Sequence, residues 1–149
     1  MRVMNIIHDS NVDGDGLRSV VFVAGCPHHC KGCHNPESWD FNAGTEMTVE
    51  DVATELLNNE LTDVTLSGGE PFAQAEELAH LVDILHEAGK DVWCYTGYTY
   101  EHLRDHGTEA QRLLLSKVDT LVDGHYIERL RDPYALFRGS SNQRIIKLR

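Results

Sequence analysis

Residues 18–35 read RSVVFVAGCPHHCKGCHN, an apolar run followed directly by a cysteine-rich loop. The run, Arg18–Ala24, has four consecutive apolar side chains, a pattern typical of a strand buried on both faces of a parallel sheet. The loop places Cys26, Cys30 and Cys33 in the spacing C-x3-C-x2-C. Three closely spaced thiolates suit a soft metal ion or an iron–sulfur cluster. The stretch therefore predicts a buried strand with a metal centre at its carboxyl end.

The rest of the chain alternates between predicted helices and predicted strands. The helical patterns begin near Thr48, cover Gln74–Glu87 and occur in two pieces between Tyr100 and Lys117. The strand patterns are Thr62–Ser67, Asp91–Thr96, Thr120–Asp123 and an extended segment at Arg144–Leu148. This alternation predicts an α/β fold with a mostly parallel sheet. No linker divides the 149 residues, so we expect one domain over residues 1–149.

Polar or glycine-rich motifs follow four of the predicted strands. They are the cysteine loop, Ser67–Pro71, Tyr95–Tyr98 and Asp123–His125. The carboxyl ends of parallel strands lie at one edge of a sheet, and ligands collect beyond that edge. We therefore expect the four motifs to build one shared site.

Composition narrows the classes of function. Hydrophobic residues make up 41% of the chain, which favours a packed globule over disorder. The net charge of -11 disfavours nucleic-acid binding, although the segment from His125 onward has six basic and two acidic residues. There is no apolar run long enough for a membrane span and no signal-peptide pattern. Clustered cysteines without an export signal indicate a cytoplasmic protein that uses thiols for metal binding.

Spacing alone leaves the kind of cysteine site open. A structural zinc site needs a fourth ligand, which His28, His29 or His34 can supply. A ferredoxin-like electron carrier needs a fourth cysteine, and Cys94 is the remaining one. Cys94 lies in a predicted strand, where a buried thiol is the commoner role. The third possibility is a cluster in which one iron lacks a protein ligand and is open to a substrate.

Taken together, the motifs resemble the radical S-adenosylmethionine superfamily. Its two hallmarks are C-x3-C-x2-C and a GGE-like run after the second strand, here Gly68-Gly69-Glu70. Asp13–Arg18 resembles the D-G-P-G-x-R segment of glycyl-radical-enzyme activases, with Asp15 in place of the usual proline. Further segments resemble the branch that activates anaerobic (class III) ribonucleoside-triphosphate reductases: Val92–Tyr98, Leu121–Gly124, Asp132-Pro133 and Arg138–Gln143.

The resemblance implies a radical SAM core, which is a partial β/α barrel. A complete eight-fold barrel needs ~250 residues, so only a truncated one fits this chain. Cys26, Cys30 and Cys33 are implied to bind three irons of one [4Fe-4S] cluster per chain. S-adenosyl-L-methionine is implied to chelate the fourth iron. The residues implied to contact this cosubstrate are Gly32, Cys33, His34, Gly68, Gly69, Glu70 and Thr96.

The implied activity is the generation of a glycyl radical on a partner enzyme through reductive cleavage of S-adenosylmethionine. The implied partner is the large catalytic subunit of an anaerobic ribonucleotide reductase, with an electron donor such as flavodoxin or a thioredoxin-type reductant. No catalytic side chain beyond the cluster ligands is implied. The competing interpretations are an activase of another glycyl radical enzyme such as pyruvate formate-lyase, a radical enzyme that acts on a small molecule, and a zinc-binding interaction module.

Overall fold

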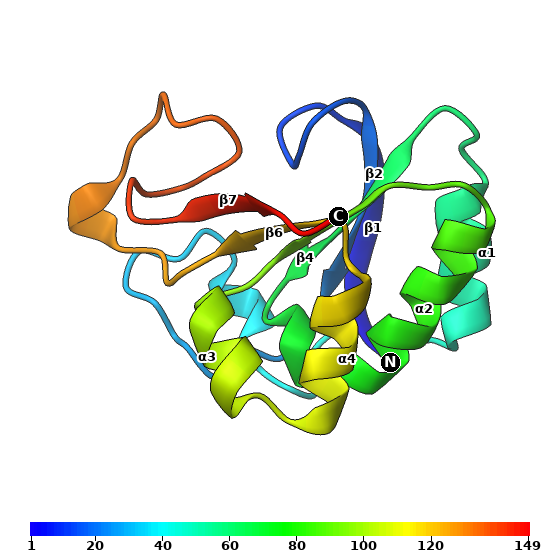
Figure 1. Ribbon diagram of the computed structural model, residues 1–149, viewed down its shortest axis with the longest axis horizontal. Helices are drawn as coiled ribbons and strands as arrows, with labels where there is room; N and C mark the ends of the chain where they lie inside the picture. The colour runs from blue at the N-terminus through cyan, green and yellow to red at the C-terminus, as the bar shows by residue number, and fades with distance from the viewer.

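Seven strands form one open sheet in the computed structural model, which describes residues 1–149 (Figure 1). The strand order is β3-β1-β2-β4-β5-β6-β7, and the terminal strands β3 and β7 do not pair with each other. The strands are β1 (Arg2–Ser10), β2 (Arg18–Val23), β3 (Thr45–Glu46), β4 (Asp63–Gly68), β5 (Val92–Tyr95), β6 (Thr120–Asp123) and β7 (Arg144–Lys147).

The sheet is parallel at its centre and antiparallel at its edges. Strands β2, β4, β5 and β6 run parallel, whereas β1, β3 and β7 are antiparallel to their neighbours. The α/β class is confirmed, and the expectation of a mostly parallel sheet is right only for the four central strands. The connections β1–β2 and β6–β7 contain no α-helix, and a parallel pair needs a long crossover, usually helical. The edge strands therefore return antiparallel.

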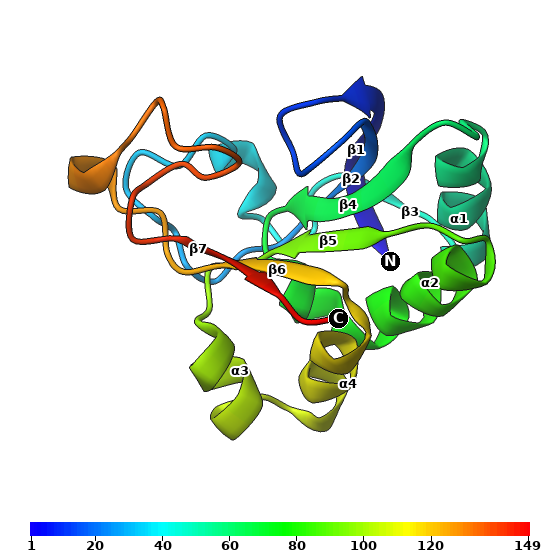
Figure 2. The same cartoon turned by 45° about the horizontal axis from the view of Figure 1, so that its top comes forward.

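Four helices lie on one side of the sheet, and the long loops extend from its other side and its end (Figures 1 and 2). They are α1 (Val49–Leu57), α2 (Ala75–Glu87), α3 (Tyr100–His106) and α4 (Glu109–Lys117), close to the predicted positions. Thr48, Thr99 and Thr108 cap α1, α3 and α4 by accepting a backbone N–H hydrogen bond with the side-chain hydroxyl. None of the helices is both long enough and apolar enough to cross a bilayer.

The hydrophobic core fills the space between the sheet and the helices. It includes Leu56 of α1, Leu78 and Leu81 of α2, and Leu114 of α4, all fully buried. Cys94 belongs to this core and is also fully buried, and burial raises its thiol pKa well above the usual range. The position of Cys94 confirms the interpretation as a core thiol. The side of the sheet that faces the helices is thus occupied by the hydrophobic core, and the functional groups come from the loops at the ends of the strands.

The buried guanidinium of Arg18 connects the loop before β2 to β4 and to Asp91, the residue that precedes β5. It donates to the carbonyl of Asp15 at 2.6 Å, to the hydroxyl of Thr65 at 2.9 Å and to the carboxylate of Asp91 at 2.7 Å. It also lies over the ring of Trp93, 5.5 Å from the centroid. Arg18 is only 1% exposed and Thr65 is fully buried, so the hydroxyl of Thr65 depends on this contact rather than on water, whereas the Asp91 carboxylate is partly exposed.

We expect Arg18→Met to lower the free energy of unfolding by about 2–3 kcal/mol, because it leaves buried acceptors without a donor. Urea denaturation of the cluster-free chain measures the effect. The control is Arg104→Met, which removes an exposed guanidinium paired with its neighbour Asp105 and should leave the urea midpoint unchanged. Equal midpoints for the two variants would show that the Arg18 network does not stabilise the fold.

Candidate functional site

A cavity of about 590 Å³ opens at the carboxyl ends of the parallel strands. The loops after β2, β4, β5 and β6 all contribute to its wall. Ligand sites in open α/β sheets are usually found at this edge, beyond the carboxyl ends of the strands. The four motifs that the sequence singled out are represented there by Cys26, Cys30, Cys33, Ser67, Gly68, Gly69, Tyr95, Thr96, Gly97 and Gly124. Segments that lie almost one hundred residues apart in the chain thus build one site.

A further wall of the cavity was not predicted. It consists of residues 133–139 and Gln143, which precede β7 and lie beside the cysteine loop (Figures 1 and 2). The side chain of Gln143 holds this segment by accepting from the amide of Gly139 at 2.8 Å and donating to the carbonyl of Gly124 at 3.0 Å. The segment has neither helical nor strand periodicity, so only its resemblance to a family motif marked it.

Strand β7 anchors that segment to the body of the protein. Arg144 of β7 donates to the buried carboxylate of Asp123 at the end of β6 and to Glu101 of α3 at 2.8 Å. Hydrogen bonds to these two carboxylates raise the pKa of the Arg144 guanidinium. Asp123 also accepts from the amide of Tyr100 at 2.8 Å and so helps to fix the start of α3. The wall formed by residues 133–139 is therefore held at both the sheet and a helix.

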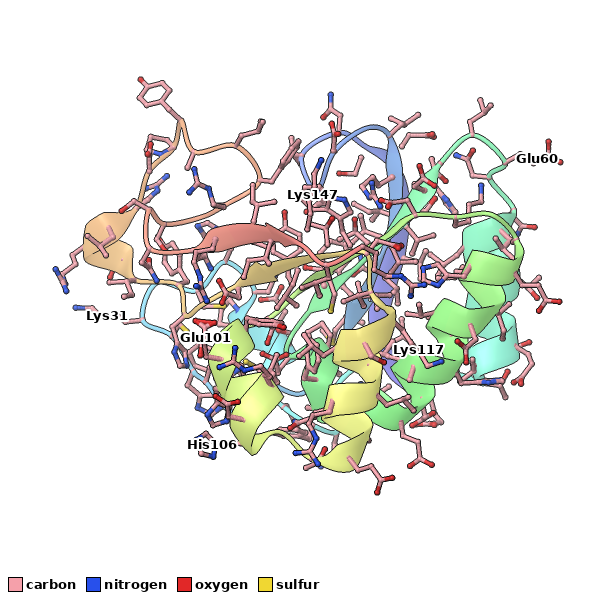
Figure 3. The ribbon with its side chains drawn as sticks, viewed as in Figure 1. Lys31, Glu60, Glu101, His106, Lys117 and Lys147 are labelled. Carbon is pink, nitrogen blue, oxygen red and sulfur yellow. The ribbon has the colours of Figure 1, made fainter.

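The three cysteines of the loop are all free thiols. Cys26 is buried, whereas Cys30 and Cys33 are partly exposed, and all three line the cavity. Lys31, at the tip of the loop, points outward to solvent (Figure 3). Burial raises the pKa of the Cys26 and Cys30 thiols, so a metal that binds them must displace their protons.

The three histidines of the cysteine loop have other partners. His28 bonds to Glu70, His29 stacks on Trp39 with ring centroids 4.6 Å apart, and His34 lies against Tyr126. No group of three or more His, Cys, Asp or Glu side chains is arranged to hold a metal ion. A Cys3His zinc site would need thiolates about 2.3 Å from one ion and a histidine released from its present contact. A cluster distributes its thiolates over separate irons and needs no histidine.

Five of the seven residues expected at the cosubstrate line the cavity. These are Cys33, His34, Gly68, Gly69 and Thr96. Gly32 and Glu70 are not part of the wall. Gly32 faces the side chain of Glu128, which would lie 2.9 Å from an added Cβ. Glu70 is fully buried behind the wall, so its carboxylate does not face the cavity as an ammonium ligand would.

The backbone at Gly69 touches the backbone of the cysteine loop. The amide of Gly69 donates to the carbonyl of Val23 at 2.8 Å, and the amide of Glu70 donates to the carbonyl of Gly25 at 2.8 Å. A Cβ on Gly69 would lie 2.5 Å from the carbonyl oxygen of Gly25, well inside contact distance. Position 69 therefore requires glycine, because the loop after β4 approaches the cysteine loop closely at Gly25, the residue before Cys26.

Comparisons with known proteins agree with this arrangement. The family model described as "4Fe-4S single cluster domain" matches residues 12–146, so the chain belongs to the class of single-cluster iron–sulfur domains. A Haemophilus influenzae protein named anaerobic ribonucleoside-triphosphate reductase-activating protein is 38% identical over 143 residues, which cover 89% of this chain and 88% of the relative. The chain belongs to the family of anaerobic ribonucleoside-triphosphate reductase-activating proteins.

Two further relatives with the same name show how widely the likeness extends. The Escherichia coli K12 protein is 36% identical over 147 residues, 93% of each chain. The protein of Enterobacteria phage T4 is 37% identical over 141 residues, which cover 90% of this chain and 86% of the relative. At these shares of the chain, the likeness includes the cysteine loop and all four helices.

Proposed function

We propose that the chain activates an anaerobic ribonucleoside-triphosphate reductase by generating a glycyl radical on its large catalytic subunit. The observation that carries the proposal is that three free cysteines share one cavity with the glycine-rich ends of neighbouring parallel strands. The family name of the relatives supplies the partner. A flavodoxin or a thioredoxin-type reductant is the proposed electron donor, and the cytoplasm is the proposed location.

The donor set fits a [4Fe-4S] cluster with an open iron. Cys26, Cys30 and Cys33 would hold three irons, and Cys94 is committed to the core on the helical side. When bound and reduced, the cluster supplies one electron for cleavage of the S–C5′ bond of S-adenosylmethionine, which yields methionine and a 5′-deoxyadenosyl radical. The role of the protein is to orient the cosubstrate and to exclude competing reactions.

The cavity also fits S-adenosylmethionine. Its volume of about 590 Å³ lies within the range of small-molecule sites. Gly68 and Gly69 carry no side chain that would hold a ligand away from the backbone, and Thr96 is also part of the wall. The Nε of Arg138 and the indole N–H of Trp39, both from residues of the wall, are buried without a partner. A carboxylate or a ribose hydroxyl of the cosubstrate would satisfy such donors.

The architecture supports a finer proposal, a radical SAM core built as a partial β/α barrel over residues 1–149. The helices cover one side of the sheet only, and the sheet does not close (Figure 2). An open barrel leaves a path along which a glycine on another protein can reach the radical. The net charge of -11 supports a protein target over a nucleic acid.

The test is a glycyl-radical assay. The protein, reconstituted anaerobically with iron and sulfide, is mixed with a reductant, S-adenosylmethionine and an anaerobic ribonucleotide reductase, and EPR is recorded. We expect a glycyl radical on the reductase and none when S-adenosylmethionine is omitted. A parallel mixture with pyruvate formate-lyase tests the alternative target. A radical on the lyase alone, or no radical on either enzyme from a protein that holds its cluster, would contradict the proposal.

A further inference from the structure

The carboxylate of Glu70 is a hydrogen-bond hub behind the cavity wall. One of its oxygens accepts from the amide of Gly97 at 2.7 Å, and the other accepts from the amide of Phe72 at 2.9 Å. The hydroxyl of Thr96 lies within 3.0 Å of both oxygens. Glu70 is fully buried, so these donors replace the water that the carboxylate would otherwise bind. They come from the loops after β4 and β5.

The remaining donor to Glu70 comes from the cysteine loop. Nε2 of His28 lies 2.6 Å from the Glu70 carboxylate, and because a carboxylate only accepts, that nitrogen carries the hydrogen. Nδ1 of His28 lies 3.0 Å from Nε2 of His125, which follows β6. His28 therefore links the cysteine loop to the ends of three neighbouring strands.

Packing confines the His28 ring to this position. The ring meets Tyr98 edge-on with centroids 4.5 Å apart, and its side chain is 8% exposed. A Cβ on Gly97 would lie 2.5 Å from the ring, so the backbone of the β5 loop has closed onto the histidine. Such contacts leave the ring little freedom to rotate away from Glu70.

We propose that Glu70 and His28 are positioning residues: they fix the middle of the cysteine loop against the ends of β4 and β5 and so set the shape of the cosubstrate pocket. The inference rests on the proposed function for the identity of the cosubstrate. It assigns Glu70 an indirect role, because its carboxylate is fully used by donors of the protein. It also assigns a role to His28, which lies midway between Cys26 and Cys30 in the sequence and whose two ring nitrogens contact Glu70 and His125.

The test compares two substitutions at one position. His28→Leu has a similar volume but no donor, whereas His28→Gln keeps an N–H that can reach Glu70. In the reconstituted full chain, we expect His28→Leu to raise the Kd for S-adenosylmethionine about tenfold at unchanged iron content, as loss of a charge-assisted hydrogen bond predicts. His28→Gln should restore most of the affinity. Calorimetric titration gives the Kd, and thermal melts check that both variants remain folded.

A second readout needs neither cluster nor cosubstrate. In the metal-free full chain, Cys26 is only 9% exposed, so its reaction with N-ethylmaleimide should become faster when the loop opens. We expect alkylation of Cys26, mapped by mass spectrometry, to be at least about fivefold faster in His28→Leu than in the wild type or His28→Gln. Glu70→Gln should accelerate it as well, because the amide cannot accept from all four donors.

The two readouts separate the inference from the proposed function. Wild-type Kd and wild-type alkylation rate in His28→Leu would overturn the positioning role. Equal loss of affinity in His28→Leu and His28→Gln would also overturn it, since ring packing rather than the hydrogen bond would then matter. A wild-type chain that assembles its cluster but binds no S-adenosylmethionine would overturn the proposed function, and the alkylation rates would still decide whether Glu70 and His28 hold the loop.

Discussion

Cys30→Ala should abolish glycyl-radical formation on the reductase and prevent assembly of a stable [4Fe-4S] cluster. In the proposed site three cysteines hold three irons, and removal of one would leave two protein ligands for a cluster with an open iron. The effect should exceed that of any substitution at the cavity outside the three cysteines, because every later event depends on the cluster. Iron and sulfide analysis, together with EPR of the mixture with reductase, measures it. Cys26→Ala and Cys33→Ala should behave alike.

Cys94→Ser is the matched control for that prediction. Cys94 is fully buried in the hydrophobic core on the helical side of the sheet. Its replacement should lower the stability of the fold but leave iron content and the EPR spectrum of the cluster unchanged. A cluster lost in Cys94→Ser as well as in Cys30→Ala would favour a four-cysteine electron carrier, which needs all four thiols. Zinc in place of iron in the protein isolated without air would favour the zinc-binding module.

Gly69→Ala should reduce both cluster assembly and binding of S-adenosylmethionine, because the added methyl group would collide with the backbone of the cysteine loop. The added methyl would meet the carbonyl of Gly25 at 2.5 Å and the carbonyl of Ser38 at 3.1 Å. Both partners are backbone atoms, so relief requires movement of the cysteine loop itself. We expect the iron content after reconstitution to fall by at least half and the Kd for S-adenosylmethionine to rise at least about tenfold, since overpacking of this kind costs about 1–3 kcal/mol.

Gly89→Ala controls for the general cost of replacing a glycine. Gly89 has a φ of +81° at the end of α2, and nothing lies within 4 Å of an added Cβ. The variant should be less stable but should bind iron and S-adenosylmethionine as the wild type does. If Gly69→Ala kept full iron content and lost affinity for S-adenosylmethionine alone, the loop contact would matter less than direct contact of Gly69 with the cosubstrate.

The central part of the fold was predictable because its signals are local. Neighbouring residues alone produce the apolar run at Arg18–Ala24, the helical periodicity of Gln74–Glu87 and the cap at Thr48. The observed bounds of β2, α2 and the start of α1 lie within a residue or two of the predicted ones. Strand β1 was not predicted, because apolar and polar residues do not alternate regularly along Arg2–Ser10, although its positions alternate between half-buried and exposed over most of its length. Its pairing depends on β2, a partner that local patterns do not specify.

The candidate site was predictable in its membership but not in the roles of its members. Motifs at the ends of successive strands indicated one shared edge, and the cavity contains all four. Glu70 was expected to face a ligand because a carboxylate beside two glycines suits an ammonium. In the folded chain it is buried and bonded to His28, Thr96 and the amide of Gly97. The direction in which the Glu70 side chain points depends on the hydrogen-bond donors around it, and these donors come from loops that are distant in the sequence.

The sequence by itself determined the parallel centre of the sheet, the cysteine loop at its edge and the family to which the chain is similar. These features follow from periodicity, spacing and residue type, which are local properties of the chain. The tertiary structure alone decided the antiparallel edge strands, the further wall of the cavity at residues 133–139 and the link between Glu70 and His28. Each of these depends on contacts between segments far apart in the chain, and such contacts are selected only when the whole core packs.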